Sequence, residues 1–224
     1  MTGVLVAVCR VHALLPDRGN GVTAIDKRPV TSSVRVRPLG LFGDVQAERQ
    51  HHGGIDQAVY AYAEEDALRL ATLLGREVTP GLFGENLRTR GVDVTGAVIG
   101  ERWRVGENVL LEVTYPRTPC GTFERRMGVP GWQDTFHEAG APGAYLRVLH
   151  TGTIQAGDPV ELVERPDHGV TVGRWFTASA PHDAEALLDA DERGRIRIGA
   201  KLRTHAERAI RKAARGAERA LSAP

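Results

Sequence analysis

The sequence predicts a mixed, mainly β fold: a barrel-like β domain with flanking helices over residues 1–166, then a small helical C-terminal subdomain over residues 167–224. Through most of the first part, short runs rich in Val, Leu and Tyr alternate with turns that contain Gly, Pro or Asn. Near Pro166 the composition changes to alanine-rich segments with helical periodicity. With 224 residues, 42% of them hydrophobic, the chain can bury a core of domain size.

The N-terminal third is expected to be rich in strands. Residues 3–12 and 33–38 have the pattern of strands, and 23–30 reads as a further extended segment bounded by a proline. The string AVYAY (58–62) predicts a short strand that runs into AEEDALRLATLLG. That segment predicts one amphipathic helix, because it begins with acids, repeats apolar residues at helical spacing and stops at a glycine.

The middle of the chain returns to strands with GENLRTR (84–90) and GERWRVGENVLLEVTYP (100–116). The Gly-acid-x-Val pattern of VGENVLLEV recurs in AGDPVELVE (156–164), which predicts two hairpins of one antiparallel barrel. Between them, residues 121–140 are expected to form short helices broken at Pro130.

The C-terminal segments 180–192 and 201–221 are predicted to be helices. The last one carries an apolar stripe that should pack against another part of the chain, formed by Leu202, Ala206, Ala209, Ile210, Ala213, Ala217 and Leu221. Between Lys201 and Arg219 it has seven Lys or Arg and two Glu, a net charge of +5. A solvated polar face explains this charge better than nucleic-acid binding does, because no stacking aromatics accompany it.

The overall composition argues against two classes of protein. The formal net charge of +1 does not suit a general nucleic-acid or anionic-membrane binder. The longest apolar run, residues 4–9, is too short for a membrane span, and no signal-peptide pattern surrounds it. We therefore expect a cytoplasmic protein with two free thiols, of which Cys9 is a small core residue.

The second cysteine has a different setting. In YPRTPCGTFE (115–124), Cys120 follows a proline and precedes a glycine at the end of a predicted strand, so its thiol should be reachable. Arg117 and Thr118 lie within three residues, and a nearby cation lowers a thiol pKa toward the thiolate that binds metals or attacks electrophiles. On this stretch alone, a half-buried loop cysteine without a function is an equally good interpretation.

Two histidines offer a base for a nucleophilic cysteine. His51 and His52 lie in QHHGGIDQ ahead of a strand, where two imidazoles and an unhindered backbone suit a polar ligand. A zinc site lacks support, since no second cysteine lies at ligand spacing and no H-E-x-x-H occurs.

Further polar residues flank predicted strand ends. Lys27 in TAIDKRPV, Arg49 in DVQAER, and Asn86 and Arg88 in GENLRTR could join Arg117 in a cationic pocket for an anionic group. No phosphate-binding glycine loop is present, so side chains would have to hold a phosphate. Asp44 is a secondary candidate that could serve a structural turn.

The order of these motifs resembles the MOSC domain, the family named after the C-terminal domain of molybdenum cofactor sulfurases. TAIDKRPV, GLFGDVQAERQHHGGIDQAVYAY, GLFGENLRTRGVDV and VIGERWRVGENVLLEVTYPRTPCGTF follow one another as in the stand-alone bacterial YiiM-like branch, from about residue 3 to residue 165. The helical remainder is less similar to that branch's three-helix C-terminal domain.

The resemblance implies a β-barrel-like fold that holds molybdenum cofactor (Mo-molybdopterin), with Cys120 as the thiolate ligand of the metal. It also implies cofactor contacts from Lys27, Arg49, His51, His52, Asn86, Arg88, Arg117 and Thr118. The branch is associated with reduction of N-hydroxylated or N-oxygenated compounds, such as hydroxylaminopurine-type bases, by oxygen-atom transfer. Two cysteines are too few for an internal cluster, so a flavin or iron-sulfur reductase would supply electrons.

Two rival interpretations remain open at this point. The chain could carry the cofactor, or a persulfide sulfur on Cys120, without catalysis. It could instead be a non-enzymatic barrel that binds RNA or a protein through its basic last helix, although its 5% aromatic content argues against RNA. A homodimer is compatible with the sequence.

Overall fold

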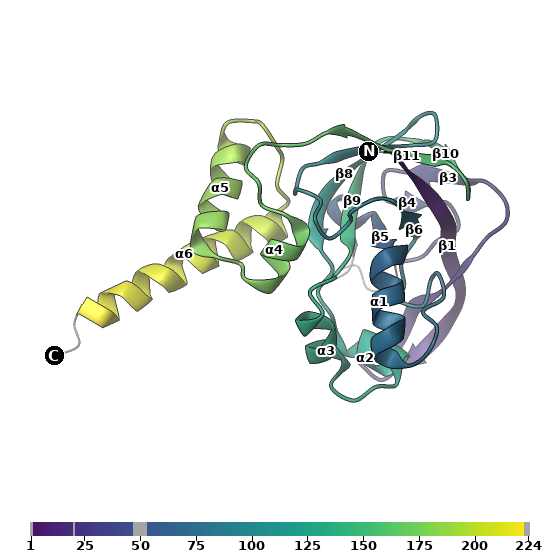
Figure 1. Ribbon diagram of the computed structural model, residues 1–224, viewed down its shortest axis with the longest axis horizontal. Coiled ribbons are helices and arrows are strands. Elements are labelled where there is room, and N and C mark those ends of the chain that lie inside the picture. Colours follow the sequence, from purple (N-terminus) through teal and green to yellow (C-terminus); the bar gives the residue numbers. More distant parts are fainter. Residues whose placement is uncertain (1, 20, 47–52, 222–224) are drawn as a thin grey trace.

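The computed structural model describes residues 2–19, 21–46 and 53–221 (Figure 1). Its strands are β1 (Thr2–Asp17), β2 (Gly21–Pro29), β3 (Val34–Arg37), β4 (Gly40–Leu41), β5 (Val59–Ala63), β6 (Leu87–Arg90), β7 (Arg102–Val105), β8 (Val109–Pro116), β9 (Ala144–His150), β10 (Gly152–Ile154) and β11 (Pro159–Glu164). Its helices are the 3-10 turn η1 (Ile55–Gln57) and α1 (Glu64–Leu74), α2 (Gly121–Met127), α3 (Trp132–Glu138), α4 (Val172–Thr177), α5 (Pro181–Glu192) and α6 (Ala200–Leu221).

The main sheet closes on itself into a seven-stranded barrel. Its order is β11-β7-β8-β9-β5-β6-β1, and the ring is completed where Thr2 and Val4 of β1 pair with Glu161 and Pro159 of β11. Among the described strands of this ring, β5 and β6 are the one pair that runs parallel. Strand β2 pairs with β1 and extends the sheet beyond the ring, while β10, β3 and β4 form a second small sheet. The predicted mainly β, barrel-like fold is confirmed.

Strands β7 and β8 form the predicted hairpin, with Val105 opposite Val109. Strands β11 and β9 differ from the expectation. The AGDPVELVE strand, β11, pairs with β7 and β1 and not with its predecessor, because β10 pairs with β3 in the other sheet. Strand β9 was not predicted at all, although it is fully integrated between β8 and β5.

Helices α2 and α3 are inserted between β8 and β9, as the break at Pro130 predicts, and an aromatic cluster holds them. Phe83 contacts Phe123, Trp132 and Phe136 with ring centroids 5.3, 6.0 and 5.9 Å away, and all four side chains are fully buried. Phe83 belongs to the loop after α1, so this cluster joins that loop to the two inserted helices.

The same loop is held from the other side by a buried ion pair. Arg88 of β6 binds the Glu85 carboxylate through Nε and Nη2, and both side chains are fully buried. Its guanidinium also donates to Glu64 Oε2 at 3.0 Å and to two loop carbonyls. Glu85 in turn accepts hydrogen bonds from the backbone N–H groups of Gly81 and Phe83. Both charged groups of the pair therefore have hydrogen-bond partners.

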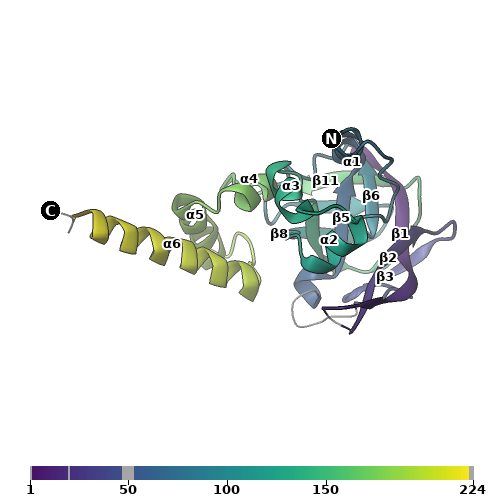
Figure 2. The same ribbon diagram turned by 90° about the horizontal axis from the view of Figure 1, so that it is seen from below.

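The C-terminal helices share one hydrophobic core with the barrel. Val172 and Trp175 of α4, Leu187 of α5 and Leu202 of α6 belong to the same buried cluster as the barrel strands. Figures 1 and 2 show these helices beside the barrel, with α6 running outward from it. Whether residues 167–224 form a subdomain of their own stays a prediction.

Helix α6 packs along only part of its apolar stripe. Leu202 and Ala206 are buried, and His205 bonds the Tyr115 hydroxyl of β8 at 2.5 Å. Residues 211–216 are exposed, because this part of the helix extends past α5 (Figure 1). No helix in the described part of the chain is both long and apolar enough to cross a membrane.

The Arg88–Glu85 pair predicts a specific stability effect. Replacing Arg88 with Met should lower the free energy of unfolding by about 3–5 kcal/mol, because the Glu85 carboxylate would stay buried without its cation. Urea denaturation measures this loss. Arg90→Met on the same strand is the matched control, since that side chain is 61% exposed and should change stability by less than about 0.5 kcal/mol. Equal effects of the two substitutions would contradict the structural role of Arg88.

His168, just after the barrel, predicts a pH effect on stability. Its Nε2 lies 2.8 Å from the Ile99 carbonyl and its Nδ1 accepts from the Val170 N–H, which requires a neutral ring. Burial lowers the pKa of His168 below its usual 6.5. The unfolded chain therefore takes up this proton first, so the stability from His168 is present above about pH 6.5 and is lost as the pH falls toward the lower folded-state pKa.

Unfolding free energies measured between pH 4.5 and 8 check this sign. His168→Gln should remove the corresponding part of the pH dependence, whereas replacement of the exposed His150 by Gln should leave it unchanged. A wild-type stability that rises as the pH falls through 6.5, relative to His168→Gln, would contradict the prediction.

Candidate functional site

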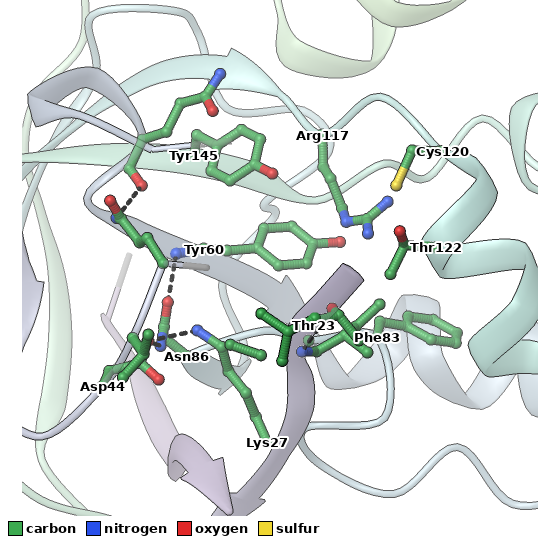
Figure 3. Close-up of a pocket in the computed structure, with 17 residues that line it drawn as sticks. Thr23, Lys27, Asp44, Tyr60, Phe83, Asn86, Arg117, Cys120, Thr122 and Tyr145 are labelled. Atoms are coloured by element: carbon green, nitrogen blue, oxygen red, sulfur yellow. Dashed lines mark hydrogen bonds and ion pairs between the residues drawn. The ribbon is translucent and has the colours of Figure 1, made fainter. Parts of the chain in front are cut away.

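A cavity of about 770 Å³, including the part that opens to solvent, lies between β2, the loop after α1, and the start of α2 (Figure 3). Its lining combines apolar and aromatic side chains with a few polar groups, which is the usual composition of a small-molecule site. The lining residues used below are Val22, Thr23, Ala24, Ile25, Lys27, Asp44, Tyr60, Phe83, Asn86, Arg117, Cys120, Thr122 and Tyr145.

Cys120 lies in the wall of this cavity, half-buried, at the residue that immediately precedes α2. Its backbone is extended, with φ −140° and ψ 167°, so the chain turns from the end of β8 into the helix at this residue. The prolines of YPRTPC thus end the strand ahead of the thiol, and the sequence-based prediction of a reachable Cys120 agrees with its place in the cavity wall.

Arg117 is the buried cation beside this thiol. It is 6% exposed, and its guanidinium carbon lies 4.1 Å from the centre of the Phe123 ring and 5.7 Å from that of Tyr60. The Cys120 thiol is one of the groups that raise its pKa. Within residues 2–19, 21–46 and 53–221, no carboxylate forms an ion pair with it. Figure 3 shows the guanidinium next to the sulfur. A desolvated guanidinium without a carboxylate is suited to an anionic partner.

The charge states around the thiol are a charged arginine and neutral phenols. Burial alone would lower the pKa of Arg117, but Tyr145, Tyr60 and Cys120 raise it overall. Burial also raises the pKa of Tyr60 well above 10 and raises that of Tyr145, with Arg117 opposing the shift. Both phenols are therefore neutral at physiological pH while the arginine is charged.

Lys27 lines the cavity too, but its charge is already balanced. Its Nζ lies 2.5 Å from Asp44 Oδ2, with only 11% and 7% of the two side chains exposed. Asp44 also accepts from the Val11 N–H through its other oxygen. The secondary candidate Asp44 thus binds Lys27, a predicted contact to the cofactor phosphate or pterin, and reduces the charge that Lys27 can offer.

Asn86 is close to the cavity, but other contacts occupy its amide. The NH₂ group donates to Asp44 Oδ2 at 2.8 Å and to the Cys9 carbonyl at 3.2 Å, and Oδ1 accepts from the Tyr60 N–H at 3.1 Å. It therefore ties β5, β1 and the Asp44 segment together. This arrangement positions the cavity wall and leaves the amide little capacity for a pterin.

Two other predicted contacts lie elsewhere. Arg88 is fully buried in its ion pair with Glu85 and does not line the cavity, so the structure gives no support for a direct pterin contact. Thr118 is exposed and is likewise outside the cavity lining; its carbonyl lies 3.4 Å from Arg117 Nη1. The predicted candidates Arg49, His51 and His52 lie outside the residues that the structure describes.

The aromatic side chains that line the site were not predicted from the sequence. Tyr60 and Tyr145 pack with ring centroids 5.4 Å apart beside Arg117, and Phe83 forms another part of the wall. The strings AVYAY and GAYLRV hold these tyrosines on neighbouring strands, but only the β5–β9 pairing, which sets Tyr60 opposite Tyr145, brings them together.

Cys9 plays no part in the cavity. It is fully buried in β1, and burial raises its pKa to about 12, so its thiol stays protonated and inert, as the sequence predicts for a core cysteine. In the same described residues, no group of three or more His, Cys, Asp or Glu side chains could hold a metal ion by itself.

Comparison with known proteins agrees with this architecture. Residues 48–161 match the MOSC domain. The chain is 34% identical over 165 residues to the uncharacterized protein YflK of Bacillus subtilis, covering 74% of each chain. It is 34% identical over 147 residues to the protein YiiM of Escherichia coli, covering 64% of this chain and 65% of YiiM. A protein named reductase from Gibberella moniliformis is 33% identical over 151 residues, which are 66% of this chain and 27% of that protein.

Solved structures show the same fold over nearly the whole chain. The crystal structure of YiiM from Geobacillus stearothermophilus superposes with a TM-score of 0.74 at 25% identity, covering 93% of this chain and 99% of that one. YiiM from Escherichia coli superposes with a TM-score of 0.70 at 24% identity, covering 95% and 94%. This chain belongs to the MOSC domain family and is a YiiM-like member of it.

Proposed function

We propose that the cavity binds molybdenum cofactor with Cys120 as the protein ligand of the metal, and that the protein reduces N-hydroxylated or N-oxygenated compounds. One observation carries the proposal: a half-buried thiol lies in the cavity wall beside the buried guanidinium of Arg117, which has no carboxylate partner among the described residues. The MOSC domain is generally associated with molybdenum cofactor, and one relative is named a reductase.

The residues present fit this cofactor. A thiolate is a soft ligand that suits a metal already bound by the sulfurs of a dithiolene. The cofactor also carries a phosphate, and the positive charge of Arg117 offers a partner for an anion.

The chain's own residues would hold the reacting groups in place. When bound, the molybdenum cofactor supplies the metal centre that accepts an oxygen atom from the substrate. Arg117 keeps a positive charge beside the Cys120 sulfur and favours its thiolate form. The side chains of Val22, Ala24 and Ile25 of β2 would offer an apolar wall to an apolar or planar substrate.

Turnover would require electrons from another protein. Reducing R–NH–OH to R–NH₂ and water consumes two electrons and two protons. The chain has two cysteines, and Cys9 is buried and protonated, so an iron–sulfur cluster within the chain has no ligand set. A separate flavin or iron-sulfur reductase is the donor that fits this requirement.

Replacing Cys120 with Ser tests the proposal in protein made by a cofactor-competent host. We expect the molybdenum content and hydroxylamine reduction with an artificial electron donor to fall by at least about 100-fold, because a hydroxyl is a much poorer ligand than a thiolate. Inductively coupled plasma mass spectrometry measures the metal.

Cys9→Ser is the matched control. It should lower stability by about 1–3 kcal/mol by burying a hydroxyl, and should leave metal content per folded protein unchanged. Full activity of Cys120→Ser would overturn the proposal. Wild-type protein that holds molybdenum and reduces none of the substrates, or that transfers a persulfide from Cys120, would support a carrier in its place.

A further inference from the structure

We propose that two ion pairs between the β1–β2 hairpin and α2 act as a clamp that closes the cavity wall over Cys120. The pairs are Asp17–Arg125 and Asp26–Arg126, here called the hairpin clamp. The four residues are positioning residues, since none of them lines the cavity. The inference deepens the proposed function by assigning control of access to its thiol, and its test does not require bound cofactor.

The hairpin needs support from outside the sheet. Strand β2 pairs with β1 alone among the described strands and lies beyond the closed barrel. It nevertheless supplies the cavity wall with Val22, Thr23, Ala24 and Ile25. Its pairing with β1 is interrupted by two register shifts between Val11 and Leu15, so the ladder alone fixes its far end weakly. Contacts with α2 are therefore needed to hold this wall in place.

The first pair joins the end of β1 to α2. Arg125 Nε and Nη2 each lie 2.8 Å from an oxygen of Asp17, a two-bond arrangement that fixes distance and orientation. The Asp17 side chain is 4% exposed. Asp17 Oδ2 also accepts a hydrogen bond from the hydroxyl of Thr122. Thr122 lines the cavity, so this hydrogen bond connects the Asp17 carboxylate to the cavity wall.

The guanidinium of Arg125 occupies a gap between two glycines. A Cβ added to Gly19 would lie 2.9 Å from its Nη2, and one added to Gly121 would lie 3.0 Å from its Nη1. Gly19 belongs to the hairpin turn, and Gly121 directly follows Cys120. Arg125 thus connects the tip of the hairpin with the residue next to the thiol.

The second pair repeats the arrangement along β2. Arg126 Nη2 lies 2.7 Å from Asp26 Oδ1, and the Asp26 side chain is 4% exposed. In both pairs the buried carboxylate belongs to the hairpin and the guanidinium belongs to α2. Removing the α2 guanidinium takes away an ion pair between hairpin and helix, although Asp17 keeps its hydrogen bond from Thr122 and Asp26 keeps Arg28 of its own strand, 3.4 Å away. The clamp therefore couples the hairpin wall to the start of α2.

Alkylation of Cys120 in purified full-length protein without cofactor tests the clamp. Mass spectrometry follows the rate with a small reagent, iodoacetamide, and with a bulky one, a fluorescein maleimide, and Cys9 reports any global opening. Arg125→Gln should raise the bulky-reagent rate by about 5- to 30-fold, the change expected when one charged hydrogen-bonded contact no longer favours the closed wall. The small-reagent rate should change much less.

Three further variants distinguish a clamp from general loosening. Asp17→Asn should reproduce the effect, the Asp17→Asn/Arg125→Gln double variant should add little to it, and Arg125→Lys should restore part of the wild-type rate. Arg69→Gln, which removes an exposed pair with Asp66 on α1, is the matched control and should change neither rate.

Unchanged size selectivity in Arg125→Gln would overturn the inference, as would additive effects in the double variant or faster labelling of Cys9 in parallel with Cys120. If Arg125→Gln does not fold, Arg126→Gln takes its place with the same expected selectivity. Because the readout is thiol access, the inference can fail while molybdenum binding stands, and the reverse also holds.

Discussion

The cavity is organised around one constraint, the burial of the Arg117 guanidinium beside the Cys120 thiol. Arg117 is desolvated in the cavity wall between aromatic faces, and Cys120 is its close polar neighbour. In the described chain no carboxylate balances its charge, although carboxylates pair with Lys27, Arg88, Arg125 and Arg126 nearby. A site that pairs these four neighbouring cations with carboxylates and leaves Arg117 beside a sulfur keeps positive charge for a ligand.

The rest of the polar framework holds the cavity walls. The Arg88–Glu85 pair fixes the loop that carries Phe83, and the amide of Asn86 joins Asp44, β1 and β5 behind Tyr60. The hairpin clamp would complete the enclosure on the side of β2. Buried networks of this kind are rigid when every member is bonded, which suits a site that must present a thiol and a cation at a fixed separation.

Much of this arrangement could be predicted from the sequence. The turn residues of YPRTPCGTFE place Cys120 at the end of a strand, and the order of the motifs identifies the family and its barrel. The roles of Arg88 and Asn86 could not be predicted, since a polar motif at a strand end looks the same whether its side chains face a ligand or a buried carboxylate. Tyr145 was missed because its strand, β9, shows no clear alternation, and its neighbour Tyr60 becomes adjacent only through long-range pairing.

The central claim is that the Cys120 sulfur is a ligand of molybdenum. X-ray absorption at the molybdenum edge tests it most directly, on wild-type protein loaded with cofactor and on any metal retained by Cys120→Ser. We expect the wild-type spectrum to require one more sulfur neighbour than the dithiolene provides, and we expect this neighbour to be absent from the variant. The same number of sulfur neighbours in both proteins would contradict it.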